Sequence, residues 1–255
     1  MSQVLKDKVA IITGAGRGLG RAYALRFAEE GAKLFLPDIS LERAESVADE
    51  IKAKGGKAVA IETDISDENA TKKMAKKVMQ QYGSVDILVN NAAIYYGIET
   101  KPWDAWTVEE WDQIFAVNVR GTWLCCKAIA PLMIKQSSGK IINIASDVFK
   151  VTDSQFFLAY ALSKAAVSTL TQSLAAALGP SGINVNAIAP GYTATESSLR
   201  KAGSEKIFEG VIAAQCLKRR QEPADVVGTA VFLASADSDF ITGQLIIVDG
   251  GHVMI

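Results

Sequence analysis

The sequence predicts an α/β fold in which a doubly wound parallel sheet of seven strands carries helices on both faces. Short β-branched runs alternate with longer segments of helical spacing along the 255 residues, which is the order that parallel strands joined by crossover helices require. Most of the runs also lack alternation of polar and apolar residues, as expected for strands buried on both faces. Together these observations indicate a sheet of the Rossmann type.

The expected elements follow one another without a linker, a repeat or a low-complexity tract, so we expect a single domain over residues 1–255. Ser40 and Ser66 provide N-terminal signals for the second and third helices. The strands are expected at residues 8–13, 33–36, 57–61, 85–89, 140–144, 183–188 and 245–248. The helices are expected at residues 18–30, 41–54, 67–82, 108–135, 157–178 and 223–235.

One segment, residues 190–222, interrupts this alternation. It begins with Pro190-Gly191, is rich in Ser, Thr, Gly and Lys, and is too long for an ordinary connection. Connections of this length in compact domains are usually lids or binding loops. We expect a substrate lid near residues 191–222, with a solvated helical excursion as the alternative.

Composition and charge exclude several classes of protein. The chain has 27 basic and 28 acidic side chains and a formal charge of −1, so it lacks the basic excess of a nucleic-acid binder or of a polybasic membrane anchor. The charged N-terminal residues and the absence of a long apolar run predict neither a signal peptide nor a membrane span. Three cysteines without Cys-x-x-Cys spacing indicate no disulfide framework and no metal site. We therefore expect a cytoplasmic protein.

A glycine-rich turn after the first strand indicates a dinucleotide site. Gly14, Gly18 and Gly20 stand in Gly-x-x-x-Gly-x-Gly spacing between a strand and a helix. A tight turn needs positive φ, and a pyrophosphate reaches backbone N–H groups at a helix N-terminus only where no Cβ intervenes. Such a turn is a weak signal alone, but the strand before it and the helix after it strengthen it.

The form of the dinucleotide depends on two residues. Asp38 ends the next strand about 20 residues after the turn, where an acid accepts hydrogen bonds from the adenosine ribose and repels a 2′-phosphate. Arg17, inside the turn, could instead meet a 2′-phosphate. No basic residue directly follows Asp38, so we expect NAD, with NADP as the less favoured alternative.

Tyr160 and Lys164 are candidates for proton transfer. They stand at i and i+4 in a helical segment, so both project from one face. A lysine ammonium one turn away, with the positive charge of an oxidised nicotinamide, favours the phenolate and could make the tyrosine a general acid and base. An incidental Tyr/Lys pair on an ordinary helix is the alternative when the pair is considered alone.

Several short motifs follow one another along nearly the whole chain. They are Gly14-x-x-x-Gly18-x-Gly20, Asn90-Asn91-Ala92-Ala93, Asn118, Ser146, Tyr160-x-x-x-Lys164, Pro190-Gly191, Ile241-Thr242-Gly243-Gln244 and Val248-Asp249-Gly250-Gly251. In their order and spacing the sequence resembles the short-chain dehydrogenase/reductase family. The combination is specific, whereas each motif alone is not.

The resemblance implies roles for these positions. Tyr160 would exchange a proton with the substrate oxygen, Lys164 would hold the nicotinamide ribose and lower the tyrosine pKa, Ser146 would orient the substrate oxygen, and Asn118 would hold a relay water. These four are the implied catalytic residues. The implied cofactor-binding residues are Gly14, Arg17, Gly18, Leu19, Gly20, Asp38, Ile39, Asp64, Ile65, Asn91, Tyr160, Lys164, Pro190, Gly191, Thr193 and Thr195.

The sequence departs from the family pattern in two places. Ala93 stands where the family usually has glycine, which adds a methyl group near the cofactor cleft. Ser146 lies one residue further from Tyr160 than in the commonest family spacing. We expect the extra residue in the loop 147–155, which leaves the pose of Ser146 less certain than its position at a strand end.

The substrate is expected over the carboxyl ends of the strands. Aromatic residues dominate the segments that follow strands four to six, which favours a compact, partly apolar secondary alcohol or its ketone. The expected substrate residues are Tyr95, Phe149, Gln155 and Tyr192. His252, the single histidine, is expected to be structural or on the surface.

The leading hypothesis is an NAD-dependent dehydrogenase of secondary alcohols that acts on a small molecule. A 3-oxoacyl thioester reductase is the alternative within enzymes, and a non-catalytic dinucleotide-binding regulatory protein is the alternative from another class. The family resemblance and the small apolar residues of the segment 157–178 favour a homotetramer that buries this helix and the last strand between subunits.

Overall fold

The computed structural model describes residues 3–95, 97–201 and 203–254. Seven strands form one sheet in the order β3-β2-β1-β4-β5-β6-β7, and every neighbouring pair is parallel. The order reverses between β1 and β4, so a crevice opens there at the carboxyl ends of the strands. The strands are β1 Val9–Ile12, β2 Lys33–Asp38, β3 Lys57–Glu62, β4 Ile87–Asn90, β5 Gly139–Ile144, β6 Ile183–Pro190 and β7 Leu245–Val248.

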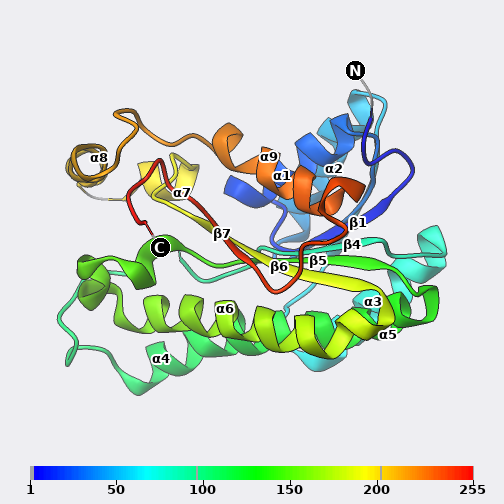
Figure 1. The fold of residues 1–255 in the computed structure, drawn as a ribbon, viewed down its shortest axis with the longest axis horizontal. Coiled ribbons are helices and arrows are strands. Elements are labelled where there is room, and N and C mark those ends of the chain that lie inside the picture. Colours follow the sequence, from blue (N-terminus) through cyan, green and yellow to red (C-terminus); the bar gives the residue numbers. More distant parts are fainter. Residues whose placement is uncertain (1–2, 96, 202, 255) are drawn as a thin grey trace.

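Helices cover both faces of the sheet (Figure 1), which confirms the predicted fold class. One face carries α1 Gly18–Glu29, α2 Leu41–Ala53 and α9 Pro223–Ala234. The other carries α3 Glu68–Tyr82, α4 Val108–Phe115, α5 Thr122–Gln136 and α6 Leu158–Leu178. No helix within the described ranges is long and apolar enough to cross a membrane.

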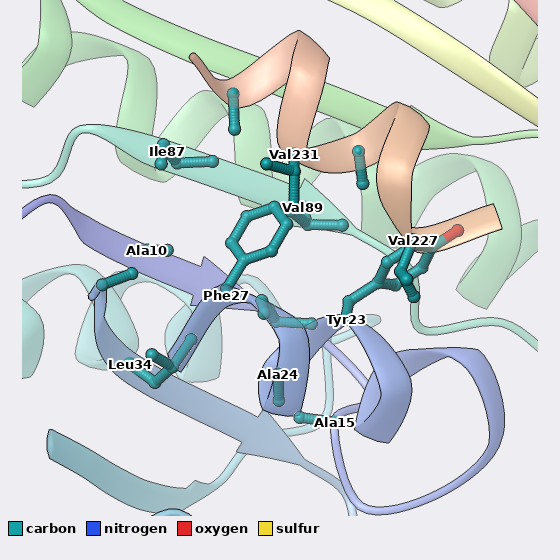
Figure 2. Packing of buried hydrophobic residues seen from close by; sticks show 14 of the residues in the cluster. Ala10, Ala15, Tyr23, Ala24, Phe27, Leu34, Ile87, Val89, Val227 and Val231 are labelled. Carbon is teal, nitrogen blue, oxygen red and sulfur yellow. The ribbon is translucent and has the colours of Figure 1, made fainter. Parts of the chain in front are cut away.

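Each strand contributes to two cores because successive side chains point to opposite faces. Ala10 and Ile12 of β1 pack under α1 and α9, whereas Val9 and Ile11 pack on the face covered by α3, α5 and α6. Figure 2 shows the first core, where Phe27 of α1 lies among residues from α9 and the strands. The absence of polar alternation in the strands follows from this arrangement.

Two details of the predicted helices were wrong. The expected helix 108–135 is interrupted, because a π-helical stretch, Ala116–Gly121, separates α4 from α5. The start of α3 is capped by Asp67 and not by Ser66: the Asp67 carboxylate accepts a hydrogen bond from the Asn69 N–H at 2.8 Å, and the Ser66 hydroxyl donates to Asp64 instead. Ser40 caps α2 as predicted.

The segment 191–222 contains two further helices, α7 Glu196–Leu199 and α8 Ser204–Ala214. A bridge between Thr193 and Gln221 closes its base, and the Ala194 N–H donates to the Gln221 carbonyl at 2.8 Å. In Figure 1 both helices lie beyond the carboxyl end of β6. The two alternatives expected for this segment, a lid and a helical excursion, are therefore compatible. The segment contains helices, and it lies where a lid over the carboxyl ends of the strands would lie.

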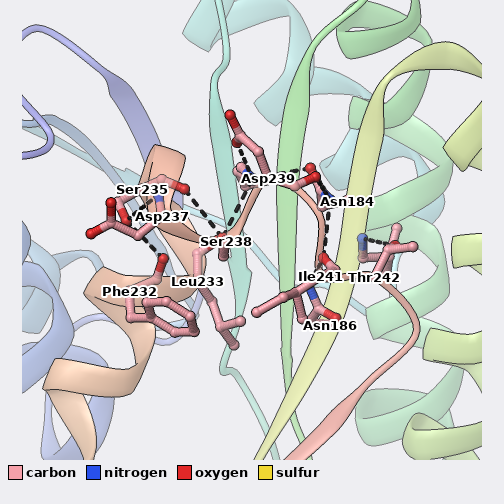
Figure 3. A network of polar contacts seen from close by, with 12 residues as sticks. Asn184, Asn186, Phe232, Leu233, Ser235, Asp237, Ser238, Asp239, Ile241 and Thr242 are labelled. Atoms are coloured by element: carbon pink, nitrogen blue, oxygen red, sulfur yellow. Dashed lines mark hydrogen bonds and ion pairs between the residues drawn. The ribbon is translucent and has the colours of Figure 1, made fainter.

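Side-chain amides of β6 fix the approach to β7 (Figure 3). Asn184 donates to the carbonyls of Asp239 and Ile241, both at 3.0 Å, and Asn186 donates to the Ile241 carbonyl at 2.8 Å. The Thr242 hydroxyl accepts from the Val185 N–H. These bonds hold the segment before β7 against β6, so β7 and the residues that follow it have a defined position at the sheet edge.

Candidate active site

A cavity of about 620 Å³ lies at the carboxyl ends of the strands. Among the residues expected to be catalytic, Ser146, Tyr160 and Lys164 line it, and Asn118 does not. Every residue expected to bind the cofactor lines it as well: Gly14, Arg17, Gly18, Leu19, Gly20, Asp38, Ile39, Asp64, Ile65, Asn91, Tyr160, Lys164, Pro190, Gly191, Thr193 and Thr195. Residues far apart in the chain thus share one site.

The glycine turn leaves no room for a side chain at Gly14 or Gly20. Gly14 has φ +63°, and a Cβ on it would lie 2.8 Å from the Cα of Ala92. A Cβ on Gly20 would lie 2.0 Å from the Gly14 carbonyl oxygen. These close approaches bring the N-terminus of α1 to the cavity, and a helix N-terminus is a favourable site for a pyrophosphate.

Asp38 is buried at the end of β2 and is held by three donors. Its carboxylate accepts from the backbone N–H groups of Gly16 and Ser40, each at 2.9 Å, and from the Arg43 guanidinium at 3.2 Å. Arg43 also lines the cavity, and its Nε is buried without a hydrogen-bond partner in the described part of the chain. Sequence reasoning missed Arg43, although its place in the first turn of α2 is a usable signal.

Asn91 connects the ends of β1 and β4. Its side-chain amide donates to the carbonyls of Thr13 at 3.0 Å and Gly14 at 3.2 Å. The Thr13 hydroxyl in turn accepts from the N–H groups of Asn91 and Ala92, both at 3.0 Å. Asn91 therefore fixes the glycine turn against the neighbouring strand, while its exposed part borders the cavity.

Residues that follow β3 also line the part of the cavity next to the glycine turn. The Asp64 carboxylate accepts from the backbone N–H and the hydroxyl of Ser66, at 2.8 and 2.7 Å. Ile65 is buried, and Gly121 of the π-helical stretch approaches so closely that a Cβ there would lie 2.8 Å from the Ile65 side chain. The nucleotide region of the cavity thus has a polar turn and an apolar wall, which fits a dinucleotide.

Tyr160 and Lys164 are buried on one face of α6. The Lys164 ammonium donates to the Ile144 carbonyl at 2.7 Å and lies 5.7 Å from the centre of the Tyr160 ring. Ser146 follows β5, and its hydroxyl accepts from the Val148 N–H at 3.2 Å. The ring of Tyr95 lies 5.3 Å from that of Tyr160, so the segment after β4 covers the tyrosine.

Burial is the largest cause of the pKa shifts of Tyr160 and Lys164. It lowers the pKa of Lys164 to about 8. It also raises the pKa of Tyr160 well above the usual value; the Ser146 hydroxyl opposes this rise, and the Asp147 carboxylate adds to it. The chain's own groups therefore keep Tyr160 protonated at neutral pH. The predicted lowering of its pKa requires the additional positive charge of an oxidised nicotinamide.

These pKa directions predict different pH profiles for the two reaction directions. If Tyr160 is the expected acid in ketone reduction, it must be protonated, so kcat/KM for reduction is expected to be flat between about pH 6 and 8. If it is the expected base in alcohol oxidation, kcat/KM for oxidation is expected to rise with pH, by up to about tenfold per unit. Initial rates in a constant-ionic-strength buffer series check this. A flat oxidation profile would contradict the assignment of Tyr160 as the base.

Asn118 lies in the π-helical stretch and not on the cavity wall. Its side-chain oxygen accepts from the Ile94 N–H at 2.7 Å, and its amide donates to the Ile94 carbonyl at 3.2 Å and the Ser163 hydroxyl at 3.0 Å. The side chain therefore holds the segment after β4 against α6. Its implied role in a water relay stays a prediction.

The substrate end of the cavity differs from the expectation at two of four positions. Tyr95 and Tyr192 line it, but Phe149 and Gln155 do not. Phe149 packs against the small core around Ala145 and Val167, and Gln155 is exposed to solvent on a 3-10 turn. Other residues complete the wall: Ile94, Asp147, Val148, Val151, Phe157, Ile207, Val211 and His252. Ile94, Asp147, Val148 and Ile207 belong to the segments expected to line the substrate site, whereas Val151, Phe157, Val211 and His252 were not expected there.

The placement of His252 also differs from the expectation. The residue lines the cavity, and its Nδ1 lies 3.1 Å from a carboxylate oxygen of Asp147. Ligand atoms of Asp147, His252 and Asp249 lie within 4.8 Å of one another. Both oxygens of Asp249 accept backbone hydrogen bonds, from Gly251 at 2.9 Å and Val253 at 2.7 Å. The group is therefore a hydrogen-bonded cluster at the end of β7.

Glu196 of α7 contacts the glycine turn: its carboxylate accepts from the Gly18 N–H at 3.0 Å. A carboxylate is favourable at this helix N-terminus, but a pyrophosphate needs the same N–H groups. We expect Glu196→Gln to strengthen NADH binding about 2- to 5-fold, because competition by a charge worth ~0.3–1 kcal/mol is removed. Fluorescence titration measures this, and Glu209→Gln on α8 is the control. Weaker binding by Glu196→Gln would show that the carboxylate assists the cofactor.

A glycine turn and a tyrosine–lysine pair along one cavity, above the carboxyl ends of a parallel sheet, are features of dinucleotide-dependent oxidoreductases. The family model described as "Enoyl-(Acyl carrier protein) reductase" matches residues 14–252. The chain belongs to the short-chain dehydrogenase/reductase family, whose members use nicotinamide dinucleotides.

Several relatives match over almost their whole length. The chain is 38% identical over 249 residues to a 3-oxoacyl-[acyl-carrier-protein] reductase of Staphylococcus epidermidis, which covers 97% of this chain and 100% of that one. It is 41% identical over 260 residues to galactitol 2-dehydrogenase of Agrobacterium fabrum, with 98% and 99% covered. Among solved structures, a short-chain dehydrogenase/reductase from Mycobacterium marinum superposes with a TM-score of 0.92 at 34% identity, covering 99% and 98% of the two chains. Levodione reductase superposes with a TM-score of 0.88 at 30% identity, covering 96% and 97%.

Proposed function

We propose that the protein is an NAD-dependent oxidoreductase that interconverts a secondary alcohol and its ketone, with Tyr160 as the general acid and base. The supporting observation is that Ser146, Tyr160 and Lys164 border one cavity together with the glycine turn. The presence of this complete set argues against a purely regulatory dinucleotide-binding protein. The proposed location is the cytoplasm, where an exposed thiol such as that of Cys216 stays reduced.

The chain's residues divide the work between binding and proton transfer. The glycine turn would hold the pyrophosphate, Asp38 the adenosine ribose and Lys164 the nicotinamide ribose, and the bound nicotinamide supplies or accepts the hydride. Tyr160 would donate a proton to the ketone oxygen in reduction and accept it in oxidation, while Ser146 orients that oxygen. The apolar wall with Ile94, Val148 and Tyr192 would exclude water.

NAD is the proposed cofactor because Asp38 is buried and ionisable at the end of β2. A 2′-phosphate beside this carboxylate would place like charges together in a partly desolvated site. Arg43, which pairs with Asp38, is a countercharge that sequence reasoning did not include. Arg43 is already paired with Asp38. We therefore propose that the Asp38 carboxylate, and not Arg43, discriminates between NAD and NADP.

Replacing Asp38 with alanine tests this assignment. The ratio of kcat/KM with NAD to that with NADP is expected to fall by about 10-fold or more, because the ribose hydrogen bonds are lost and Arg43 is freed for a phosphate. Steady-state kinetics with both cofactors measure the ratio. Asp49→Ala, which removes an exposed acid from the following helix α2, should leave it unchanged. A wild-type preference for NADP would overturn the proposal for Asp38.

A 3-oxoacyl thioester reductase is the second candidate, because relatives at 38–40% identity carry that name. Similarity to galactitol 2-dehydrogenase favours the first candidate, a dehydrogenase of secondary alcohols. A panel of secondary alcohols, ketones and acetoacetyl-coenzyme A, each with NAD(H) and NADP(H), separates the two candidates. Higher kcat/KM for the thioester than for every alcohol and ketone would establish the second one.

We also propose a homotetramer that buries α6 and β7 between subunits. Val167, Ala175 and Leu178 of α6 pack inside the chain, whereas Leu162 is 43% exposed. Trp123 of the neighbouring α5 is 42% exposed. All four residues of the edge strand β7 are only half-buried. Such apolar surface favours subunit contact, and sedimentation velocity tests it; a monomer would contradict it.

A further inference from the structure

Asp147 and His252 form a polar pair on the wall of the substrate end of the cavity. Asp147 directly follows Ser146 after β5, and His252 follows β7, 105 residues further along the chain. The two side chains are 9% and 19% exposed, and they are 3.1 Å apart at the closest oxygen and nitrogen. The mechanism proposed above uses neither of them.

The segment that carries His252 is held independently of this pair. The Asp249 carboxylate accepts backbone hydrogen bonds from Gly251 and Val253, and the Leu217 N–H donates to the Gly250 carbonyl at 2.9 Å. Gly251 has φ +77°, and a Cβ on it would lie 2.9 Å from Cys216. Because the backbone is already fixed, the pair is not needed to fasten the segment.

The pair lies next to the reacting groups. The Ser146 hydroxyl is 3.4 Å from an Asp147 carboxylate oxygen, and the Asp147 charge contributes to the raised pKa of both Tyr95 and Tyr160. Asp147, His252, Ser146 and Tyr160 all line the same cavity. A substrate whose oxygen contacts Tyr160 and Ser146 therefore presents its neighbouring atoms to the pair.

The pair has free hydrogen-bonding capacity beside the apolar residues Ile94, Val148 and Val151 of the cavity wall. When His252 donates from Nδ1 to Asp147, its Nε2 can accept a hydrogen bond, or donate one if the ring is protonated. No other described residue forms a hydrogen bond with Nε2. A hydroxyl group suits these neighbours, since it can donate to the carboxylate or to the ring, whereas a carboxylate or phosphate at this place would be repelled by Asp147.

We propose that Asp147 and His252 determine substrate specificity by binding a second hydroxyl group of the substrate, on a carbon near the carbinol. The substrate class is then a diol or polyol with a partly apolar remainder. This inference rests on the proposed alcohol dehydrogenase function. It adds a polar recognition element to a wall that the sequence predicted to be dominated by aromatic residues.

A matched pair of substrates tests the proposal. 2,3-Butanediol and 2-butanol share a carbon skeleton and differ by one hydroxyl group. The wild-type enzyme is expected to prefer the diol in kcat/KM by about 10-fold or more, because a buried hydrogen-bonding site disfavours an analogue that leaves it unpaired. Equal kcat/KM for the two alcohols would overturn the inference but not the function; no turnover of any alcohol or ketone would overturn the function itself.

Two substitutions of His252 separate recognition from support of the fold. His252→Asn can keep a donor for Asp147 but has no atom at the place of Nε2, so the preference for the diol is expected to fall about 10-fold or more, mainly through KM. His252→Gln can place a polar atom near the position that Nε2 occupies in the wild type, so this variant should retain part of the preference for the diol. If His252→Asn keeps the full preference for the diol, His252 serves only to hold Asp147 in place, and the proposal is overturned. Asp237→Asn, which changes an exposed acid away from the cavity, is the control.

Metal dependence supplies an independent check. The ligand atoms of Asp147, Asp249 and His252 are close enough to hold a cation. The proposal expects the preference for the diol to survive dialysis against EDTA. Loss of the preference on EDTA treatment, with recovery on addition of Mg²⁺, Mn²⁺ or Zn²⁺, would assign the cluster to metal binding and overturn direct recognition of the hydroxyl.

Discussion

Replacing Tyr160 with phenylalanine is expected to lower kcat by about 10²- to 10⁴-fold, the usual contribution of a positioned acid or base. The ring is buried on α6 beside Ser146 and Lys164, so phenylalanine keeps the packing and removes only the proton donor. NADH affinity, measured by fluorescence titration, should change little, because the loss lies in proton transfer.

Tyr23→Phe is a matched control for this experiment. Tyr23 is fully buried in the core between α1 and α9, and its hydroxyl has no hydrogen-bond partner among the described residues. Removing that hydroxyl should leave kcat unchanged and should not lower the thermal unfolding temperature. If Tyr160→Phe retained turnover near that of Tyr23→Phe, the proposed mechanism would be wrong.

Replacing Gly20 with alanine is expected to weaken NADH binding about 10- to 100-fold. The new Cβ would lie 2.0 Å from the Gly14 carbonyl oxygen and 2.6 Å from the Asn91 amide, so the turn or the start of α1 must move. Overpacking of this kind costs about 1–3 kcal/mol, and the displaced N–H groups are those that would face the pyrophosphate. Titration with NADH and thermal unfolding measure the two effects.

Gly228→Ala serves as the control for Gly20→Ala. Gly228 is exposed in α9, and a Cβ there would meet no atom within 4 Å. Alanine at such a helical site stabilises a protein by up to about 1 kcal/mol and should not change NADH affinity. Unchanged affinity in Gly20→Ala would contradict the placement of the pyrophosphate at this turn.

The sequence predicted the sheet correctly, and the positions expected to bind the cofactor line one cavity, because both depend on local patterns. Buried β-branched runs identify strands wherever helices cover both faces, and the glycines, Asp38, Tyr160 and Lys164 each lie next to a strand end or on a helix face that spacing reveals. The order of the strands then brings these positions to one crevice.

The predictions that failed concern interactions that local sequence patterns do not show. In the π-helical stretch at 116–121, the Asn118 side chain bonds to the backbone of Ile94, a contact between distant segments that a helical period cannot show. The predicted contribution of Phe149 failed because the ring turned toward the core instead of the cavity. The pairing of Asp147 with His252 joins residues 105 positions apart, and neither belongs to a spaced motif.

The position of β7 has a consequence for how this enzyme could diversify. The side chains proposed for proton transfer stand on α6 and just after the interior strand β5, whereas His252 stands on a short stretch after the edge strand β7. Changes in that stretch are therefore expected to alter which substrate is accepted while the groups proposed for the reaction stay in place. A library restricted to residues 252–254 would be a compact starting point for redirecting substrate preference.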